Sequence, residues 1–403
     1  MEKLAIDGGT PVRTKPFATW PIYGDLELQL LKEVLESGKW GGAGPTKLGY
    51  EAKLPEMERK FAELQDAAYA VSVANGTVAI TVALQAAGVK PGDEVIIPPY
   101  TFIATATAAL AYGVIPVFAD IEEDTFLIDP EKVEKLITPK TKAIIAVHIA
   151  GAPANMTRLN EIAKKHNLVL IEDAAQAVGA KWEGRGVGSL GDLGTFSLQS
   201  SKNLNAGEGG VITTNSREYW ENAWSISNVG RIPQGGWYQH ERFGQNYRMT
   251  EFQAAIVLAQ MTRLEEQMEK RETNAKLLNE LLGEIDGIRL VKRDPRVTRH
   301  AYHLYIFKLE PDLAERINKE QFAKQVTAEG VPLATGYVPL NKNKAILGKI
   351  KEWTGEEREY DCPVCERLCE KEAFWLTQNV LLSDEEDMHD IARALRKVIA
   401  SYQ

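Results

Sequence analysis

Seven short apolar runs, separated by segments with helical spacing, fill the stretch from residue 68 to residue 214 and constrain the fold of this chain most strongly. Apolar runs that do not alternate with polar residues are typical of strands buried on both faces. The sequence therefore predicts an α/β fold, with a mainly parallel seven-stranded central sheet and helices on both faces. The expected strands are 69–73, 94–97, 115–118, 143–147, 169–171, 195–198 and 210–213, and the expected helices are 78–87, 104–112, 130–136 and 155–166.

The remainder of the chain divides around one long helical pattern. A length of 403 residues suits two or three domains. We expect an N-terminal arm (1–50) with a helix at 25–37, a large domain (51–248), a connecting helix (249–282) and a smaller α+β C-terminal domain (283–403). The last helix should start near Asp384, where Ser383 and Glu386 have the spacing of a capping box.

Charge and composition exclude several classes of partner. Lys and Arg number 47 and Asp and Glu number 56, a net charge of −9, so long-range repulsion argues against nucleic acid or an anionic membrane as partner. The sequence contains no run of about 18 apolar residues, which a membrane-spanning helix would need. The first residues do not resemble a signal peptide. Three cysteines form no disulfide framework, so we expect a reducing compartment, the cytoplasm.

Polar residues follow three of the expected strands, where ligands bind in sheets of this kind. Gly76 and Thr77 open a helix and could bind an anion, although such a start is also typical of a simple turn. Asp173 could pair with a cationic ring nitrogen or a metal, or cap the next helix. Lys202 could condense with a carbonyl group, or be an ordinary solvated charge.

Together, these three sites have the chemistry that pyridoxal phosphate requires. The cofactor needs an anion cradle for its phosphate, an amine for its aldehyde and a carboxylate that keeps its ring nitrogen protonated. An aromatic side chain that stacks on the ring is also expected, and Tyr100 and Phe102 follow another strand. The order of the three sites along one sheet favours this cofactor over the separate simpler explanations.

Nearly the whole chain resembles the sugar aminotransferases of the DegT/DnrJ/EryC1/StrS family, within the fold-type I pyridoxal-phosphate enzymes. Each motif is weak alone, but together they are highly specific. The segments that carry the resemblance are 5–9 (AIDGG), 74–77 (ANGT), 100–105 (YTFIAT), 172–176 (EDAAQ), 197–210, 246–250 (NYRMT) and 362–364 (CPV).

The resemblance implies roles for the matching positions. Lys202 would form the Schiff base with the cofactor, and Asp173 would face the ring nitrogen. The other implied cofactor-binding residues are Gln176 along the ring edge, Phe102 stacked on the ring, and Gly76, Thr77 and Ser197 around the phosphate. Asn246 would reach the phosphate from a neighbouring subunit, which implies a homodimer with shared active sites.

The resemblance also indicates a branch of the family. A related dehydratase branch has histidine where Lys202 stands, so the lysine favours transamination. Many nucleotide-sugar members have histidine where Gln199 stands. Gln199, together with Trp20 and Trp40, is more similar to the branch that acts on aminocyclitol precursors such as scyllo-inosose, which the aminohydroxybenzoate synthases also resemble.

The expected function is that of a pyridoxal-phosphate-dependent aminotransferase. It would move an amino group from glutamate or glutamine to a keto-cyclitol or keto-sugar by a ping-pong mechanism, in antibiotic or polysaccharide biosynthesis. Gln199, Arg231 and Tyr337 are candidates for contacts with the substrate. The alternatives are a nucleotide-sugar aminotransferase, a dehydratase like aminohydroxybenzoate synthase, and a pyridoxal-phosphate-binding regulatory protein without turnover.

The three cysteines have a spacing that invites comparison with metal sites. Cys362, Cys365 and Cys369 supply three thiols, but the chain has no fourth cysteine, and a helix is expected at these positions. Although open three-thiolate clusters exist, buried helix positions explain these thiols better. No metal site is predicted.

Overall fold

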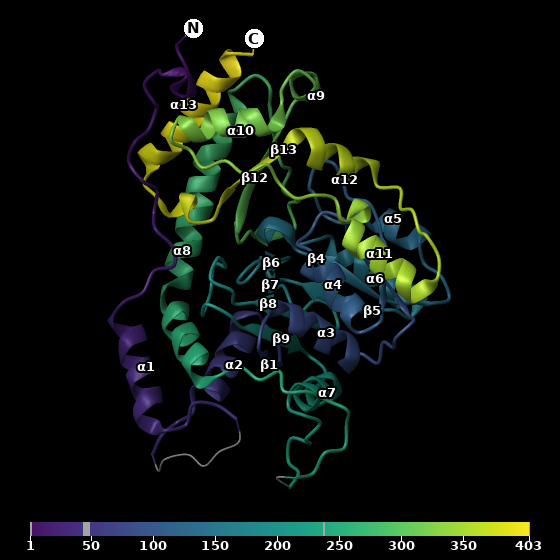
Figure 1. Ribbon diagram of the computed structural model, residues 1–403. Helices are drawn as coiled ribbons and strands as arrows, with labels where there is room; N and C mark the ends of the chain where they lie inside the picture. Colours follow the sequence, from purple (N-terminus) through teal and green to yellow (C-terminus); the bar gives the residue numbers. More distant parts are fainter. Residues whose placement is uncertain (1, 43–48, 237, 403) are drawn as a thin grey trace.

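The computed structural model describes residues 2–42, 49–236 and 238–402, and a seven-stranded sheet forms its centre (Figure 1). The strands lie in the order β1-β9-β8-β5-β4-β2-β3. Only β9 runs against the other six, because it pairs antiparallel with both β1 and β8. The mainly parallel sheet predicted from the sequence is confirmed. The bounds are β1 Tyr69–Val73, β2 Glu94–Ile97, β3 Ile115–Phe118, β4 Thr141–Val147, β5 Val169–Asp173, β8 Leu193–Ser197 and β9 Gly210–Thr214.

Helices cover both faces of this sheet, as expected. Successive residues of one strand enter different apolar clusters: Ile212 packs in the cluster that includes α3 and α4, and Val211 packs in the cluster that includes α2 and α8. Because side chains of a strand alternate between its faces, both faces are buried. The helices around the sheet are α2 Lys53–Leu64, α3 Gly76–Ala86, α4 Ala104–Ala111, α5 Pro130–Lys135, α6 Met156–His166 and α7 Arg217–Ser227.

The C-terminal part forms a second, smaller layer of sheet and helices. Its antiparallel sheet has the order β10-β12-β13, with bounds Ile288–Leu290, Leu304–Leu309 and Ala373–Thr377. A third small sheet joins β11 Val297–Arg299 to β6 Lys181–Trp182 and β7 Arg185–Gly186 of the larger part. The α-helices of the C-terminal part are α9 Pro311–Ala314, α10 Lys319–Ala328, α11 Lys344–Thr354, α12 Pro363–Arg367 and α13 Glu385–Ala400. No helix in the described parts of the chain is long and apolar enough to cross a bilayer.

A helix of 33 residues, α8 Glu251–Gly283, connects the two parts (Figure 1). Its first half buries Val257 and Leu258 in the core beside the large sheet. Its second half buries Leu278 and Leu282 in the core of the small sheet. One rigid helix therefore belongs to both cores and fixes the small sheet relative to the large one. The domain boundaries expected from the sequence stay a prediction.

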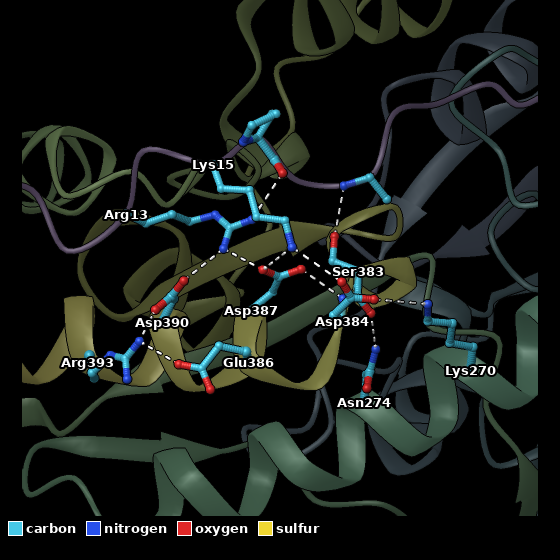
Figure 2. Close-up of polar contacts among 12 residues, drawn as sticks. Arg13, Lys15, Lys270, Asn274, Ser383, Asp384, Glu386, Asp387, Asp390 and Arg393 are labelled. Atoms are coloured by element: carbon cyan, nitrogen blue, oxygen red, sulfur yellow. Dashed lines mark hydrogen bonds and ion pairs between the residues drawn. The ribbon is translucent and has the colours of Figure 1, made fainter.

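The N-terminal arm lies along both parts. Figure 1 shows that it starts beside α13 and runs along α8 to α1 Asp25–Ser37, the helix expected there. Figure 2 shows the Arg13 guanidinium between Asp387 and Asp390 of α13, at 2.5 and 2.8 Å. Residues 1 and 43–48 of the expected arm lie outside the described residues.

Candidate active site

A cavity of about 600 Å³ opens where the parallel strands of the large sheet end. Strands β1, β4, β5 and β8 deliver residues to it at their carboxyl ends, as expected for this class of sheet. Most of the residues predicted from the sequence line this one cavity: Gly76, Thr77, Phe102, Asp173, Gln176, Ser197, Gln199, Lys202 and Tyr337. A second cavity of about 610 Å³, between α8 and the small sheet, shares none of these residues.

One wall of the cavity has the form of an anion cradle. Asn75 caps α3 by accepting the Val78 backbone N–H at 2.9 Å. The N–H groups before Val78 have no partner within the helix, as at any helix start, and can bind an anion. A Cβ atom at Gly76 would lie 2.8 Å from Cβ of Ser197, so only glycine lets the helix start approach β8 this closely. The space that glycine leaves, with the Thr77 and Ser197 hydroxyls beside it, suits a phosphate group.

Asp173 is the buried carboxylate of the cavity. It ends β5, where one oxygen accepts the Thr105 hydroxyl at 2.8 Å and the other accepts the Ala175 N–H at 3.2 Å. Burial raises the pKa of Asp173 above its ordinary value, and the Thr105 hydroxyl is the largest of the opposing effects. A cationic ring nitrogen would offset that cost, so the residue suits the acidic partner that the cofactor needs.

The neighbouring acid, Glu172, points to the other face of the sheet and is fully engaged there. It accepts backbone N–H groups of Gly188, Leu190 and Gly191 at 2.7–2.8 Å. His148 accepts a backbone N–H on Nδ1, so its Nε2 carries the proton that it donates to Glu172. The alternation along β5 thus separates a structural carboxylate from the one that lines the cavity.

Lys202 supplies the amine. It lies in the turn between β8 and β9, where its backbone N–H donates to the Gln199 carbonyl at 2.9 Å. Burial lowers the pKa of Lys202 to about 8, and the nearby Asp173 carboxylate works against that decrease. The lowered pKa increases the share of the neutral, nucleophilic amine near neutral pH. A partly buried lysine with a lowered pKa can condense with an aldehyde.

Gln176 and Tyr337 form a fixed polar pair at the side of the cavity. The Gln176 oxygen accepts the Ala150 backbone N–H at 2.7 Å, so the amide nitrogen must be the atom that faces Tyr337. That nitrogen donates to the Tyr337 hydroxyl at 2.8 Å, and burial raises the pKa of Tyr337 to about 12. The Tyr337 hydroxyl hydrogen thus remains available to a ligand in the cavity.

Three of the candidates have less direct positions. Phe102 lines the cavity but remains 57% exposed, so it lies at an open mouth. Asn246 and Arg231 do not line the cavity. Each pairs through its backbone in an isolated antiparallel β-bridge, Asn246 with Asn228 and Arg231 with His240. The roles of Asn246 and Arg231 stay predictions. Asn246 was expected to act in a neighbouring subunit, so the cavity of its own chain does not test that role.

Sequence reasoning missed several residues that complete the site. Thr105 holds Asp173, and His303 lines the cavity beside Lys202. Asn203 joins His303 to the turn that carries Lys202, although the two lie 100 positions apart in the chain. The signal for Thr105 was its place in the helix that follows β2, but no local pattern indicates His303.

The cysteines lie in the core, away from this cavity. All three are buried and unpaired, and the Cys365 and Cys369 sulfurs are 3.8 Å apart. Burial raises the pKa of Cys362 and of Cys365, so both thiols stay protonated, which suits core packing more than metal binding. Within the described residues, no group of three or more potential metal ligands occurs.

Comparisons with known proteins agree with this geometry. The sequence pattern of the DegT/DnrJ/EryC1/StrS aminotransferase family matches residues 21–396. An L-glutamine:2-deoxy-scyllo-inosose aminotransferase of Streptoalloteichus tenebrarius is 40% identical, over 98% of this chain and 97% of its own length. Its counterpart from Streptomyces kanamyceticus is 38% identical over the same shares. The crystal structure of 3-amino-5-hydroxybenzoic acid synthase superposes with a TM-score of 0.86 and 33% identity, covering 96% of this chain and 100% of that one.

Proposed function

The chain belongs to the DegT/DnrJ/EryC1/StrS aminotransferase family, and from this premise we propose that it is a pyridoxal-phosphate-dependent enzyme that transfers the amino group of glutamine to a keto-cyclitol. One observation carries the proposal. A partly buried lysine with a lowered pKa, a buried carboxylate and a glycine-dependent anion cradle line the same cavity. Each group answers one chemical demand of the cofactor.

In this proposal the residues of the chain divide the work of binding. Pyridoxal phosphate, when bound, supplies an aldehyde that takes up the amino group and a ring that accepts electrons. Gly76, Thr77 and Ser197 would hold its phosphate, and Phe102 would cover one face of the ring. Asp173 would hold a proton at the ring nitrogen, because a buried carboxylate gains most from a cationic partner.

Lys202 would have two tasks. It would hold the cofactor covalently in the resting enzyme, and its freed Nζ would move a proton between the α-carbon of the donor and the carbon that receives the amino group. A pKa of about 8 suits both tasks, because the amine can accept and return a proton near neutral pH. The same lysine would act in both half-reactions. Ping-pong kinetics would follow because the keto acid would leave before the ketone binds.

The proposed substrates follow the relatives and fit the lining of the cavity. The two relatives are named for glutamine as amino donor and 2-deoxy-scyllo-inosose as ketone. Beside Lys202, the cavity presents the neutral polar side chains of Thr101, Gln199, Ser201 and Tyr337. Neutral donors and acceptors of this kind suit the hydroxyl groups of a cyclitol.

We further propose that the enzyme is a homodimer with shared active sites, in which Asn246 of each chain reaches the phosphate in the other. The open mouth beside Phe102 supports this, because a second subunit would cover the exposed ring. The three unpaired cysteines agree with a reducing location, and the proposal keeps the cytoplasm expected from the sequence.

The test separates the two half-reactions. The purified holoenzyme is mixed with glutamine, and the visible absorbance of the cofactor and the released keto acid are followed. The aminated enzyme is then offered 2-deoxy-scyllo-inosose, scyllo-inosose and a nucleotide keto-sugar. We expect glutamine to convert the cofactor and the keto-cyclitols to restore it, with amino-cyclitol detected by mass spectrometry.

Two variants serve as controls for this test. Lys202→Ala should abolish both half-reactions, and Asp173→Asn should slow both by at least about a hundredfold, since the ring loses the partner of its proton. Restoration by the nucleotide keto-sugar alone would replace the keto-cyclitol in this proposal. Water loss without consumption of glutamine would indicate a dehydratase, and no response to any amino acid would indicate a binding protein without turnover.

A further inference from the structure

We propose that His303 presents an unprotonated Nε2 to the cavity and accepts a hydrogen bond there from a hydroxyl group of the ketone substrate. The inference rests on the proposed function and adds a residue that would distinguish polyol ketones from other ketones. It follows from a chain of hydrogen bonds that leaves only one tautomer for this histidine.

The chain of hydrogen bonds begins at Asn203, next to Lys202. The Asn203 amide nitrogen donates to the Ala301 carbonyl at 2.7 Å, and only the nitrogen end of the amide can do so. The amide oxygen therefore faces Nδ1 of His303, at 3.1 Å. Because that oxygen can only accept, Nδ1 must carry the proton.

A neutral imidazole carries one proton, so Nε2 of His303 is left bare. The ring stays neutral because burial lowers the pKa of His303 well below its ordinary value, and the cations Lys202 and Arg271 lower it further. Arg271 is itself fully buried and has no carboxylate within ion-pair distance among the described residues. The ring is therefore a hydrogen-bond acceptor on the side opposite Asn203.

The position of the ring makes this acceptor useful. His303 lines the cavity together with Lys202, directly before strand β12. The backbone before it is fixed, because the Ala301 N–H donates to the Gly151 carbonyl at 3.0 Å. In the described parts of the chain, no donor forms a hydrogen bond with Nε2. An acceptor without a protein donor, on a residue that lines a cavity proposed to bind a cyclitol, matches a substrate hydroxyl.

His300 offers a matched control only three positions away. Its Nδ1 accepts the Tyr302 backbone N–H at 2.8 Å, and its ring stacks on Tyr302 with the centroids 3.9 Å apart. It lines the second cavity instead of the one that holds Lys202. A change at His300 therefore tests what loss of a nearby imidazole does to the fold without touching the proposed site.

The first experiment compares His303→Asn, His303→Gln and His300→Asn in the two half-reactions. Asparagine can still donate to Asn203 but does not reach the position of Nε2, whereas glutamine can place its oxygen there. We expect His303→Asn to raise KM for 2-deoxy-scyllo-inosose about tenfold, which is the effect of one lost hydrogen bond, and to change the glutamine half-reaction by less than about twofold. His303→Gln should recover most of the loss, and His300→Asn should behave as wild type.

Equal losses in both half-reactions would overturn the proposal, because they would indicate that His303 acts on Lys202. Equal effects of asparagine and glutamine would overturn it too, since the acceptor position would then be unimportant. An unchanged KM in His303→Asn would have the same meaning.

The second experiment does not depend on turnover. The full-length holoenzyme is labelled with ¹⁵N at histidine, and the His303 signals are assigned with His303→Gln. We expect Nδ1 to give the signal of a protonated nitrogen and Nε2 that of a bare one, which shifts when scyllo-inositol is added. A protonated Nε2, or no shift at saturating scyllo-inositol, would overturn the inference. If the wild type binds scyllo-inositol in this way but aminates no keto-cyclitol, the proposed function fails while the inference on His303 stands.

Discussion

Lys202 and Asp173 are two groups of opposite charge that burial moves toward neutrality. The fold lowers the pKa of the lysine and raises that of the carboxylate, and each charge partly offsets the burial of the other. Both groups are therefore costly in the protein without its cofactor. A cofactor that bonds to one and brings a cation to the other would relieve both costs, which is typical of a site built for a ligand.

The first prediction concerns the titration of Lys202 in the apoprotein. Its folded pKa, about 8, lies below the reference value of 10.5, so the folded protein loses this proton before the unfolded chain does. The free energy of unfolding should therefore rise with pH between about 8 and 10.5, and below pH 8 the full cost of the buried charge remains. Labelling with an amine-reactive reagent, read by mass spectrometry, should give half-maximal modification of Lys202 near pH 8.

Asp173→Asn sharpens this prediction. Removal of the carboxylate should lower the pKa of Lys202 further, because Asp173 is the one charge that opposes the effect of burial. The exposed Lys140 in the same samples corrects for the reagent and the pH. A midpoint for Lys202 near that of the exposed lysine, or a rise in the Asp173→Asn protein, would contradict the interpretation of the site.

For single residues of the site, the sequence predicts those that lie at or after the end of a strand. It misses those that a distant part of the chain brings to the cavity. Asp173 and Lys202 could be found because buried strands end just before them. His303 could not be found, because its proton is fixed by Asn203, which lies 100 positions earlier in the chain. Only tertiary contacts decide whether such a histidine is a core residue or lines a cavity.

The N-terminal arm is the element that links the small sheet to the site. Beyond the Arg13 contacts, the Ala18 N–H donates to the Ser383 hydroxyl at 2.8 Å. Further along, the Trp20 indole N–H donates to the Ser200 carbonyl at 2.9 Å, two positions before Lys202. The arm therefore supports the lysine turn from outside, a contact that the sequence analysis did not predict.

The same region corrects one expectation from the sequence. The capping box of α13 consists of Asp384 and Asp387 instead of Ser383 and Glu386. The Ser383 hydroxyl accepts the Ala18 N–H, so the arm occupies the residue that local spacing assigned to the cap. A shift of one position at a helix end is a typical effect of a competing tertiary contact.

The second prediction compares two basic residues of the arm. Arg13→Met should destabilise the protein by about 3 kcal/mol, because Asp387 and Asp390 lose a buried cation and keep only the half-exposed Lys15 and Arg393 as partners. Lys15→Met should cost less, about 1 kcal/mol, since Lys15 is 61% exposed and lies 3.3 Å from Asp384 and 3.5 Å from Asp387. Figure 2 shows the contacts of both residues, and urea denaturation followed by fluorescence measures the two losses. Similar losses in the two variants would mean that the arm is held mainly by other contacts.

At the scale of the whole molecule, α8 explains why one cavity can draw on both parts of the chain. The helix shares its apolar residues between the core beside the large sheet and the core of the small one. This brings His303 and Tyr337, from the small part, to the same cavity as Lys202 and Asp173, from the large part. The α/β class and the long helix could be predicted from periodicity, but the strand order and the reversed β9 depend on long-range pairing that no local pattern encodes.

The final prediction asks which subunit supplies Asn246. The Ala74 N–H donates to the Tyr247 carbonyl at 2.7 Å, so the backbone beside Asn246 lies close to the anion cradle of its own chain. The Asn246 side chain nevertheless does not line that cavity. Two arrangements remain: Asn246 serves its own cradle after a local movement, or it serves the cradle of the second subunit.

Mixing two inactive variants decides between them. Lys202→Ala removes the amine, and Asn246→Asp places a negative charge where a phosphate is expected, so each homodimer should be inactive. If Asn246 acts across the interface, a mixed dimer has one site with both defects and one intact site. Random reassortment should then restore about a quarter of wild-type activity, given two-fold symmetry. If Asn246 serves its own chain, every site in the mixed dimer keeps one defect and the mixture stays inactive. The two variants carry different affinity tags, and recovery of dimers that hold both tags confirms that exchange has occurred, so the absence of activity in those dimers would rule out the shared site.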